Sequence, residues 1–404
     1  MKILILNCGS SSVKYQLLDP EKQFALAKGT VSRIGMSGAV LSHQRYDGDE
    51  VKLSGEILDH TAAIEYVLAI LLSPNHGVLK EKSDISAVGH RVVHGGERFT
   101  GSVLINDEVV GMIRDCIELA PLHNPHNLRG INACFRILPG IPQVAVFDTA
   151  FHSQMPEYAY IYGLPYVLYK RYGIRRYGFH GTSHYFVSRQ AYKLLNRPKE
   201  ECKVITAHLG NGCSIAAVDG GVSVDTSMGF TPLEGLLMGT RSGDLDPSVI
   251  LHIMGREEIG LSEANSLLNK HSGLTGISGE SSDMRDIINS VQNGNPRAKL
   301  ALDVFCYRLM KYIASYAAAM GGVDAVVFTG GIGENAAPVR LKSCEKLEFM
   351  GIKIDSVKNE RVKAGEEADI SADDSKVRVF VIPTNEELVI AIDTMRIIQN
   401  LNSR

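Results

Sequence analysis

Short runs of apolar residues that end in polar, glycine-rich turns are the clearest pattern in this chain of 404 residues. Residues 3–6 are apolar, residues 7–12 are rich in Ser and Gly, and residues 13–17 alternate apolar and polar side chains. Such a pattern is typical of a buried strand, a turn and a half-buried strand. The sequence therefore predicts that the chain begins with a hairpin.

A second segment with the same plan begins near residue 203. Residues 204–207 lead into the polar, glycine-rich stretch 208–212, and residues 214–218 return as an apolar run. The two hairpins are separated by roughly 200 residues, a spacing at which a repeated pattern indicates duplication of a whole structural unit. A chance likeness is the alternative, and we favour a duplicated core with one copy in each of two domains.

Helical periodicity fills the sequence between and after the two hairpins. Amphipathic patterns predict helices at 108–120 and 183–195, and a longer helix at 297–320 that ends at two glycines, as helices commonly do. Further strands are predicted at 144–146, 325–328 and 377–382, and a last helix at 384–399. Strands mixed with helices in both halves indicate an α/β protein.

Length, charge and cysteine content narrow the class of protein. A chain of this length favours two domains. The formal net charge of −3 gives no overall attraction for nucleic acid or an anionic membrane. No stretch approaches the ~20 apolar residues of a membrane span, and the first residues lack the apolar region of a signal peptide. Seven cysteines without CxxC spacing favour free thiols and a cytoplasmic location.

Three glycine-bearing segments that follow apolar strands are candidate phosphate cradles: 7–14, 208–212 and 329–335. Main-chain amides at such turns bind phosphate. The sequence contains no GxxxxGK[ST] motif, so it is not a P-loop protein. One such turn alone is more often an ordinary connection, but three of them together favour a phosphate-binding function.

Four charged or titratable residues stand where a ligand could meet them. Arg91 and Arg241 lie near glycines, and a guanidinium suits both carboxylate and phosphate, although a lone Arg more often makes a surface salt bridge. His180 lies between glycines before a predicted helix, a natural place for an anion. Asp148 follows a strand and either faces a ligand crevice or caps a turn.

Other polar residues are interpreted as structural. The histidine pairs 90/94 and 123/126 lack the HExxH context of a zinc site. Thr384 and Glu387 have the spacing of a capping box, which explains Glu387. Glu386 has no such explanation and is left to hold a metal, directly or through water.

These motifs, in this order and spacing, resemble the acetate kinase family over essentially the whole chain. They are NCGSSSVK (7–14), GHRVVHGG (89–96), FDTAF (147–151), GFHGTSH (178–184), HLGNG (208–212), GTRSG (239–243), GIGEN (331–335) and TNEE (384–387). The resemblance implies the duplicated two-domain α/β fold of acetate kinases, sugar kinases, Hsp70-type ATPases and actin, with ATP in an interdomain cleft. It implies an N-terminal domain of residues 1–150 plus 384–404 and a nucleotide-binding and dimerisation domain of residues 151–383.

The resemblance also implies site residues, position by position. The metal site matches Asn7 and Glu386, and the catalytic set matches Arg91, Asp148, His180 and Arg241. The substrate site matches Arg91 and an alkyl pocket of Val93, Leu122, Phe179 and Pro232. The nucleotide site matches Ser10, Ser12, Lys14, His208, Leu209, Gly210, Asn211, Gly212, Asp283, Met284, Arg285, Gly331, Ile332, Gly333, Glu334 and Asn335. Met284 stands where some members have Phe, a change that we expect to be harmless.

The implied reaction is reversible in-line transfer of the ATP γ-phosphoryl group to acetate, giving acetyl phosphate and ADP, with Mg²⁺ or substituting Mn²⁺. The resemblance also implies a homodimer without nucleic-acid or membrane partners. A carboxylic acid is already ionised at pH 7 and needs no strong base, so we expect Asp148 to orient Arg91 rather than accept a proton. Val93 is bulkier than Ala would be and narrows the alkyl pocket, so we expect a preference for acetate over propionate. The alternatives are a propionate or butyrate kinase, and an actin-like or chaperone ATPase without acyl-phosphate chemistry.

Overall fold

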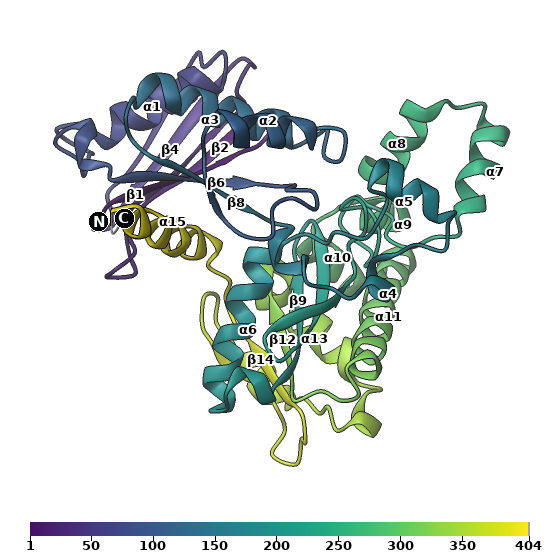
Figure 1. The fold of residues 1–404 in the computed structure, drawn as a ribbon. Helices are drawn as coiled ribbons and strands as arrows, with labels where there is room; N and C mark the ends of the chain where they lie inside the picture. The colour runs from purple at the N-terminus through teal and green to yellow at the C-terminus, as the bar shows by residue number, and fades with distance from the viewer. Residues whose placement is uncertain (403–404) are drawn as a thin grey trace. The chain divides into compact units, whose positions relative to one another are not determined.

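The computed structural model describes residues 1–402 and divides the chain into two compact units (Figure 1). Unit 1 comprises Met1–Ala150 and the returning segment Asn385–Arg404, and unit 2 comprises Phe151–Thr384. Each unit is built on its own mixed sheet with helices, which confirms the predicted α/β class.

The sheet of unit 1 has eight strands in the order β5-β4-β3-β2-β1-β6-β8-β7. The strands are β1 (Ile3–Cys8), β2 (Ser12–Asp19), β3 (Phe24–Ser32), β4 (Ala39–Arg45), β5 (Glu50–Gly55), β6 (Ala87–Val92), β7 (Val103–Leu104) and β8 (Gln143–Phe147). β1, β6 and β8 run parallel, and the remaining neighbours are antiparallel. The carboxyl ends of the three parallel strands therefore meet at one edge of the sheet.

Helices cover both faces of this sheet (Figure 1). They are α1 (His60–Leu71), α2 (Asp107–Asp115) and α3 (Asn124–Ile137) on one face and α15 (Glu386–Asn402) on the other. Strand β1 alternates accordingly: Leu4 packs in the cluster that contains α1, and Ile5 packs in the cluster that contains Ile390 of α15. Gly89 lets α15 approach β6, because a Cβ there would lie 2.7 Å from side-chain atoms of Ile390 and Thr394.

The sheet of unit 2 has six strands in the order β11-β10-β9-β12-β14-β13. They are β9 (Lys203–Leu209), β10 (Cys213–Asp219), β11 (Val222–Thr226), β12 (Ala325–Thr329), β13 (Ala368–Asp369) and β14 (Arg378–Val381). β9, β12 and β14 run parallel, and the other pairs are antiparallel. This is the topology of β3-β2-β1-β6-β8-β7 in unit 1, strand for strand, and it confirms the predicted duplication.

The helices of unit 2 surround this sheet. α6 (Gly181–Leu195) and α11 (Pro296–Ala319) pack against it from either side (Figure 1). The smaller helices are α9 (Gly273–Ser278), α10 (Met284–Gln292), α12 (Gly330–Asn335), α13 (Ala337–Cys344) and α14 (Ser356–Arg361).

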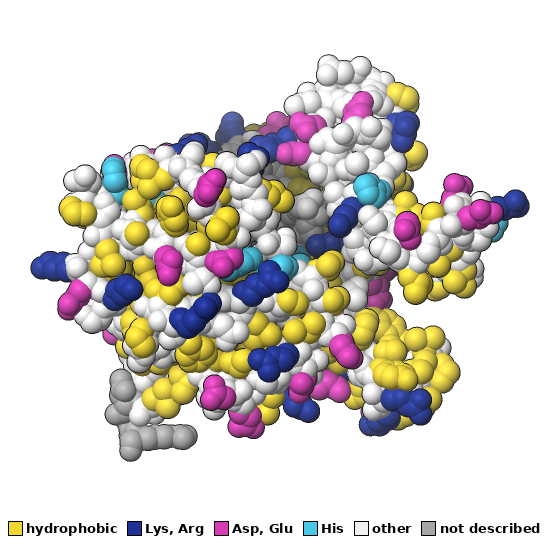
Figure 2. Space-filling view, turned by 90° about the horizontal axis from the view of Figure 1, so that it is seen from above, with side chains coloured by type: hydrophobic (Ala, Val, Ile, Leu, Met, Phe, Trp, Pro, Cys, Tyr) yellow, Lys and Arg dark blue, Asp and Glu magenta, His cyan; other side chains and the backbone are white. Residues whose placement is uncertain are grey.

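Four further helices of unit 2 bury little of their surface. No residue of α4 (Glu157–Tyr160), α5 (Tyr166–Tyr172) or α7 (Pro247–Glu257) is buried, and α8 (Leu261–Lys270) buries Ala264 alone. Tyr158, Leu251 and Leu261 are 89%, 69% and 82% exposed. Figure 2 shows hydrophobic side chains at the surface on the right of the view, the side on which Figure 1 shows α7 and α8. Such exposed apolar surface is typical of an interaction face.

Some boundaries differ from the prediction. The helix predicted at 108–120 ends at Asp115, and residues 330–335 form helix α12 rather than a glycine turn. The last helix begins at Glu386, where the Asn385 side chain accepts a hydrogen bond from the Leu388 amide at 3.0 Å. The predicted capping box of Thr384 and Glu387 is therefore wrong.

Within residues 1–402, no helix is long and apolar enough to cross a membrane. All seven cysteines are buried free thiols.

Candidate active site

The carboxyl ends of β1, β6 and β8 bring one group of predicted residues together in unit 1. Asn7 and Lys14 are direct partners across β1 and β2, so their side chains lie on the same face of the sheet. Arg91 lies within β6, Asp148 follows β8, and Glu386 is the first residue of α15. Predicted metal, nucleotide and catalytic residues thus share one sheet edge.

Arg91 and Asp148 form a buried ion pair. The Arg91 Nε donates to Asp148 Oδ1 at 2.9 Å, and Nη2 donates to Oδ2 at 2.6 Å. Asp148 is 1% exposed, and the Glu386 carboxylate lies 3.8 Å from Arg91 Nε. Burial works to lower the pKa of Arg91, but the charges of Asp148 and Glu386 outweigh it and raise that pKa. Burial raises the pKa of Asp148, and the facing guanidinium opposes that rise.

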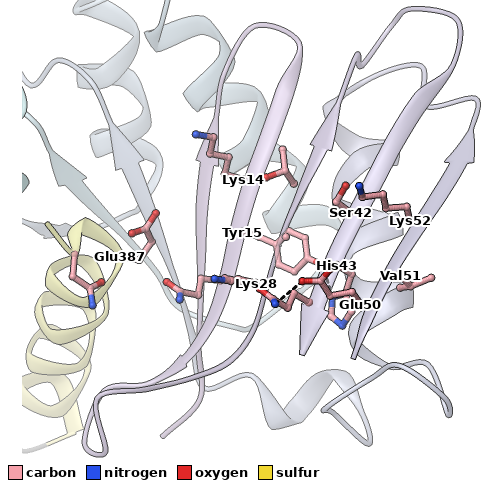
Figure 3. A pocket seen from close by; sticks show the side chains of 14 residues that line it. Lys14, Tyr15, Lys28, Ser42, His43, Glu50, Val51, Lys52 and Glu387 are labelled. Carbon is pink, nitrogen blue, oxygen red and sulfur yellow. Dashed lines mark hydrogen bonds between the residues drawn. The ribbon is translucent and has the colours of Figure 1, made fainter. Parts of the chain in front are cut away.

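Lys14 lines a polar groove of about 520 Å³ on the face of the sheet (Figure 3). The register aligns two rows of side chains across the strands. They are Lys14, Thr30, Ser42 and Lys52 in one row, and Gln16, Lys28, Gln44 and Glu50 in the next. Lys14 is an exposed residue of this groove, so its ammonium group can reach an anion there.

In unit 2, His180 has a constrained backbone. It precedes the first turn of α6 with φ 56° and ψ 26°, a left-handed conformation that is uncommon outside glycine and costs free energy. Its Nδ1 lies 2.9 Å from Ser214 Oγ, and its ring stacks on His208 with 4.3 Å between the ring centres. These contacts fix the direction of the imidazole.

Arg241 converges with His180 at Gly212. A Cβ on Gly212 would lie 3.3 Å from Arg241 Nη1 and 3.6 Å from His180 Cε1, so glycine leaves the space between them open. Arg241 Nη1 donates to the Pro232 carbonyl at 3.1 Å, and burial lowers the pKa of this guanidinium. In the described part of the chain, the charged groups that act on it include no carboxylate. Because a half-buried cation without a counter-charge loses hydration, Arg241 favours binding of an anion here.

A cavity of about 830 Å³ in unit 2 brings together three predicted nucleotide segments. Its lining includes Gly210 and Asn211, then Asp283, Met284 and Arg285, then Gly331, Ile332 and Asn335. Ile288, Ala336 and Pro338 add apolar surface. A cavity of this size with apolar walls and a few polar groups suits a small organic ligand.

The remaining predicted nucleotide residues lie elsewhere. His208, Leu209, Gly212, Gly333 and Glu334 do not line that cavity. The Glu334 carboxylate accepts from the amides of Gly330 at 2.9 Å and Thr384 at 3.4 Å, so it holds the chain rather than facing the cavity. Ser10 is exposed in the turn after β1, and Ser12 begins β2.

The four residues predicted for the alkyl pocket belong to different units. Val93 and Leu122 belong to unit 1, and Phe179 and Pro232 belong to unit 2. The Val93 amide donates to Asn127 Oδ1 at 3.1 Å, and Leu122 is 55% exposed. This pocket stays a prediction.

A chain of hydroxyl and imidazole groups behind His180 was not foreseen from the sequence. His184 Nε2 lies 2.7 Å from Ser214 Oγ, which also contacts His180, and His184 Nδ1 lies 2.7 Å from Thr206 Oγ1. Burial lowers the pKa of His184 well below its ordinary value, so it stays neutral and orders the hydroxyls. The signal was present in the motif GFHGTSH, where His184 follows His180 by one helical turn.

A second support in unit 2 was also missed. Arg176 donates to the Glu234 carboxylate at 2.7 Å and to the Ser227 carbonyl at 3.0 Å, and the Tyr162 hydroxyl donates to Glu234. These contacts hold the segment that leads to Arg241. Arg176 and Tyr162 lie 58 and 72 residues from Glu234 in sequence, so no local pattern reveals these hydrogen bonds.

Comparison with known proteins gives the family. A model of the acetokinase family matches residues 2–392. The chain belongs to this family. It is 58% identical over 399 residues to an acetate kinase of Desulfitobacterium hafniense, covering 99% of the chain and 100% of that protein. An acetate kinase of Treponema denticola is 57% identical over 399 residues.

Solved structures agree over the whole chain. The acetate kinase of Porphyromonas gingivalis superposes with a TM-score of 0.94 at 51% identity, covering 98% of this chain and 99% of that one. A propionate kinase of Francisella tularensis superposes with a TM-score of 0.91 at 44% identity, with the same coverage. The predicted family and the predicted duplicated fold are confirmed.

Proposed function

We propose that the chain catalyses reversible transfer of the ATP γ-phosphoryl group to acetate, giving acetyl phosphate and ADP. The acetokinase match and the relatives named acetate kinase support this reaction. One observation of this chain carries it: the half-buried Arg241 converges with His180 at Gly212, and the adjoining residues Gly210 and Asn211 line the 830 Å³ cavity. That arrangement suits a phosphoryl group on a nucleotide.

Arg91 receives the carboxylate of the acid in this proposal. The acid is ionised at neutral pH, so the chemical task is to bring one anion onto another rather than to remove a proton. Asp148 engages Nε and Nη2 of Arg91 and thereby fixes the plane of the guanidinium, which leaves its remaining edge to the substrate. Asp148 is thus a group that orients Arg91.

Arg241 and His180 stabilise the phosphoryl group as it transfers. Charge on its equatorial oxygens is the main obstacle, and fixed donors that need no rearrangement lower that barrier. The stacking of His180 on His208 and its contact with Ser214 hold the imidazole before substrate arrives.

Asn7 and Glu386 would hold Mg²⁺, with Mn²⁺ as a substitute. Within residues 1–402 no three His, Cys, Asp or Glu side chains cluster as a metal site. One carboxylate and one amide oxygen fit Mg²⁺, which usually binds one or two protein oxygens together with substrate phosphates and water. When bound, the ion neutralises part of the phosphate charge.

Formation of acyl phosphate tests the proposal directly. Incubation with ATP, Mg²⁺ and acetate followed by hydroxylamine should yield acetohydroxamate in proportion to ADP. ATP hydrolysis without hydroxamate would contradict the proposal and favour an actin-like or chaperone ATPase.

The preferred acid is a finer part of the proposal. Val93 is bulkier than Ala and narrows the pocket, which favours acetate, and one methylene contributes about 1–3 kcal/mol of discrimination. The likeness to a propionate kinase makes this comparison necessary. We expect a higher kcat/KM for acetate than for propionate, and the reverse order would identify a propionate kinase.

We also propose a cytoplasmic homodimer that pairs through α4, α5, α7 and α8. Their exposed apolar side chains, among them Leu251 and Leu261, support such an interface. Sedimentation should give twice the chain mass. Leu251→Asp with Leu261→Asp should give monomers, whereas Leu53→Asp, an exposed apolar site on β5 of unit 1, should not.

A further inference from the structure

Side chains of one helix hold two neighbouring segments of unit 1. Cys8, the last residue of β1, which leads into the turn of residues 9–11, and the loop that begins at Val93 both contact the first two turns of α3. The contacts come from Asn124 and Asn127, which are 0% and 3% exposed. A buried amide is stable only where its donor and acceptor atoms are both satisfied, and these two are.

Asn127 contacts both the end of β1 and the loop that begins at Val93. Its Nδ2 donates to the Cys8 carbonyl at 3.0 Å, and its Oδ1 accepts from the Val93 amide at 3.1 Å. A carbonyl only accepts and a main-chain N–H only donates, so the two partners fix which end of the amide is nitrogen. Among side chains of this size, a primary amide alone can make this pair of bonds.

The bond to Cys8 also sets the direction of the turn. Because a trans peptide is planar, its N–H points opposite to its C=O. The Gly9 carbonyl accepts from His60 Nε2 on α1 at 2.7 Å, so the Ser10 N–H points away from that helix. Asn127 fixes the preceding peptide in the same way. The two peptides that lead from β1 into the turn thus have their carbonyls directed toward α3 (Cys8) and α1 (Gly9).

We propose that Asn127 is a positioning residue that couples the phosphate turn to the loop carrying Val93. This inference rests on the proposed function, which assigns the turn to nucleotide phosphate and Val93 to the acid. When a ligand orders one of the two segments, the rigid side-chain amide of Asn127 also orders the other. Nucleotide and acid therefore assist each other's binding, and the coupling is reciprocal.

Asn124 provides a matched control on the same helix. Its Oδ1 accepts from the His94 amide at 3.1 Å and its Nδ2 donates to the His94 carbonyl at 3.0 Å and the Ile113 carbonyl at 3.4 Å. It anchors the second loop without touching β1. Asn124→Asp and Asn127→Asp make the same change of charge and shape, and each replaces a donor by an acceptor.

Hydrogen–deuterium exchange with MgADP, without any acid, tests the coupling. In the natural chain and in Asn124→Asp, MgADP should slow exchange in peptides covering both 7–14 and 93–96. In Asn127→Asp it should slow exchange at 7–14 alone. Protection of both segments in Asn127→Asp would overturn the inference. If Asn127→Asp does not fold, Asn127→Ser, which is neutral and cannot span both loops, replaces it with the same expectations.

Kinetics gives a second readout. We expect saturating MgATP to lower the KM for acetate in the natural chain and in Asn124→Asp. In Asn127→Asp that effect should disappear, and the KM for MgATP should rise roughly ten-fold, the size of one lost hydrogen bond. A chain that binds MgADP but forms no acyl phosphate would contradict the proposed function while leaving the exchange test decisive for Asn127.

Discussion

The two units share one sheet topology, but the key arginine has a carboxylate partner in one unit and none in the other. Arg91 in unit 1 is held by the buried Asp148 and lies near Glu386. Arg241 in unit 2 is half-buried, but within the described residues it has a carbonyl and no carboxylate as its partner. A guanidinium that is already paired serves to orient a ligand, whereas an unpaired one is available to neutralise new charge. Duplication thus accounts for the shared sheet topology, and the different partners of the two arginines give them different functions.

Arg241→Ala should have the largest effect on activity. Loss of the charge that stabilises the transferring phosphoryl group should lower kcat by on the order of 10³–10⁵. Thermal stability should not fall, because removal of a half-buried cation that has no carboxylate partner relieves its partial desolvation. Steady-state kinetics and calorimetry check both points. Arg361→Ala, at an exposed position of unit 2, should change neither, and a large loss of stability in Arg241→Ala would refute the comparison.

Arg91→Ala should instead destabilise the protein. It leaves the Asp148 carboxylate buried without its partner, which costs about 3–5 kcal/mol. The pKa of Asp148, already raised by burial, should rise further, so the folded state binds this proton more tightly than the unfolded state. The free energy of unfolding relative to the natural chain should therefore be better preserved at pH 5 than at pH 7.5. An equal deficit at both pH values in denaturant titrations would show that Asp148 is not the group left behind.

Asp148→Asn should lower kcat by about 10²-fold, the order expected when a reacting group is misplaced by about 1 Å. Because Asp148 orients Arg91 rather than removing a proton, the pH dependence of kcat should keep its shape. A pH–rate profile of the variant that lacks a limb present in the natural chain would assign Asp148 as a base.

Val93→Ala should have the smallest effect. It widens the unit 1 side of the proposed pocket, and the ratio of kcat/KM for propionate over acetate should rise by roughly ten-fold. Val109→Ala on α2 should leave the ratio unchanged. If the ratio also stays constant in Val93→Ala, the alkyl pocket is not formed by Val93.

The strands and helices were predictable from the sequence where hydrophobic periodicity and turn-forming residues within a short segment determine the structure. The segments 3–6, 204–207 and 325–328 are mainly apolar and lead into glycine-bearing stretches of sequence, and all three are strands in the structure. The last helix was predicted two residues too early, because Thr384 and Glu387 have capping-box spacing but Asn385 supplies the cap. Two side chains with similar capping propensity compete there, and tertiary contacts decide between them.

The candidate site was predictable only where residues lie in recognisable motifs. Arg91 and Asp148 are 57 residues apart, and their pairing depends on the adjacency of β6 and β8. Asn127, 119 residues from Cys8, lay outside every motif. A side chain that bonds the main chain of a distant loop leaves no local pattern in the sequence, because its partners are main-chain groups that any residue could provide.

The return of α15 to unit 1 has a consequence for synthesis of the chain. Ile3, Ile5 and Val144 pack against Ile390 and its neighbours on α15, which the ribosome makes after all of unit 2. That face of the first sheet stays uncovered during translation, whereas unit 2 is one continuous segment. The unit whose synthesis starts second can therefore finish folding first, and the nascent chain carries an apolar face that chaperones would recognise until α15 emerges.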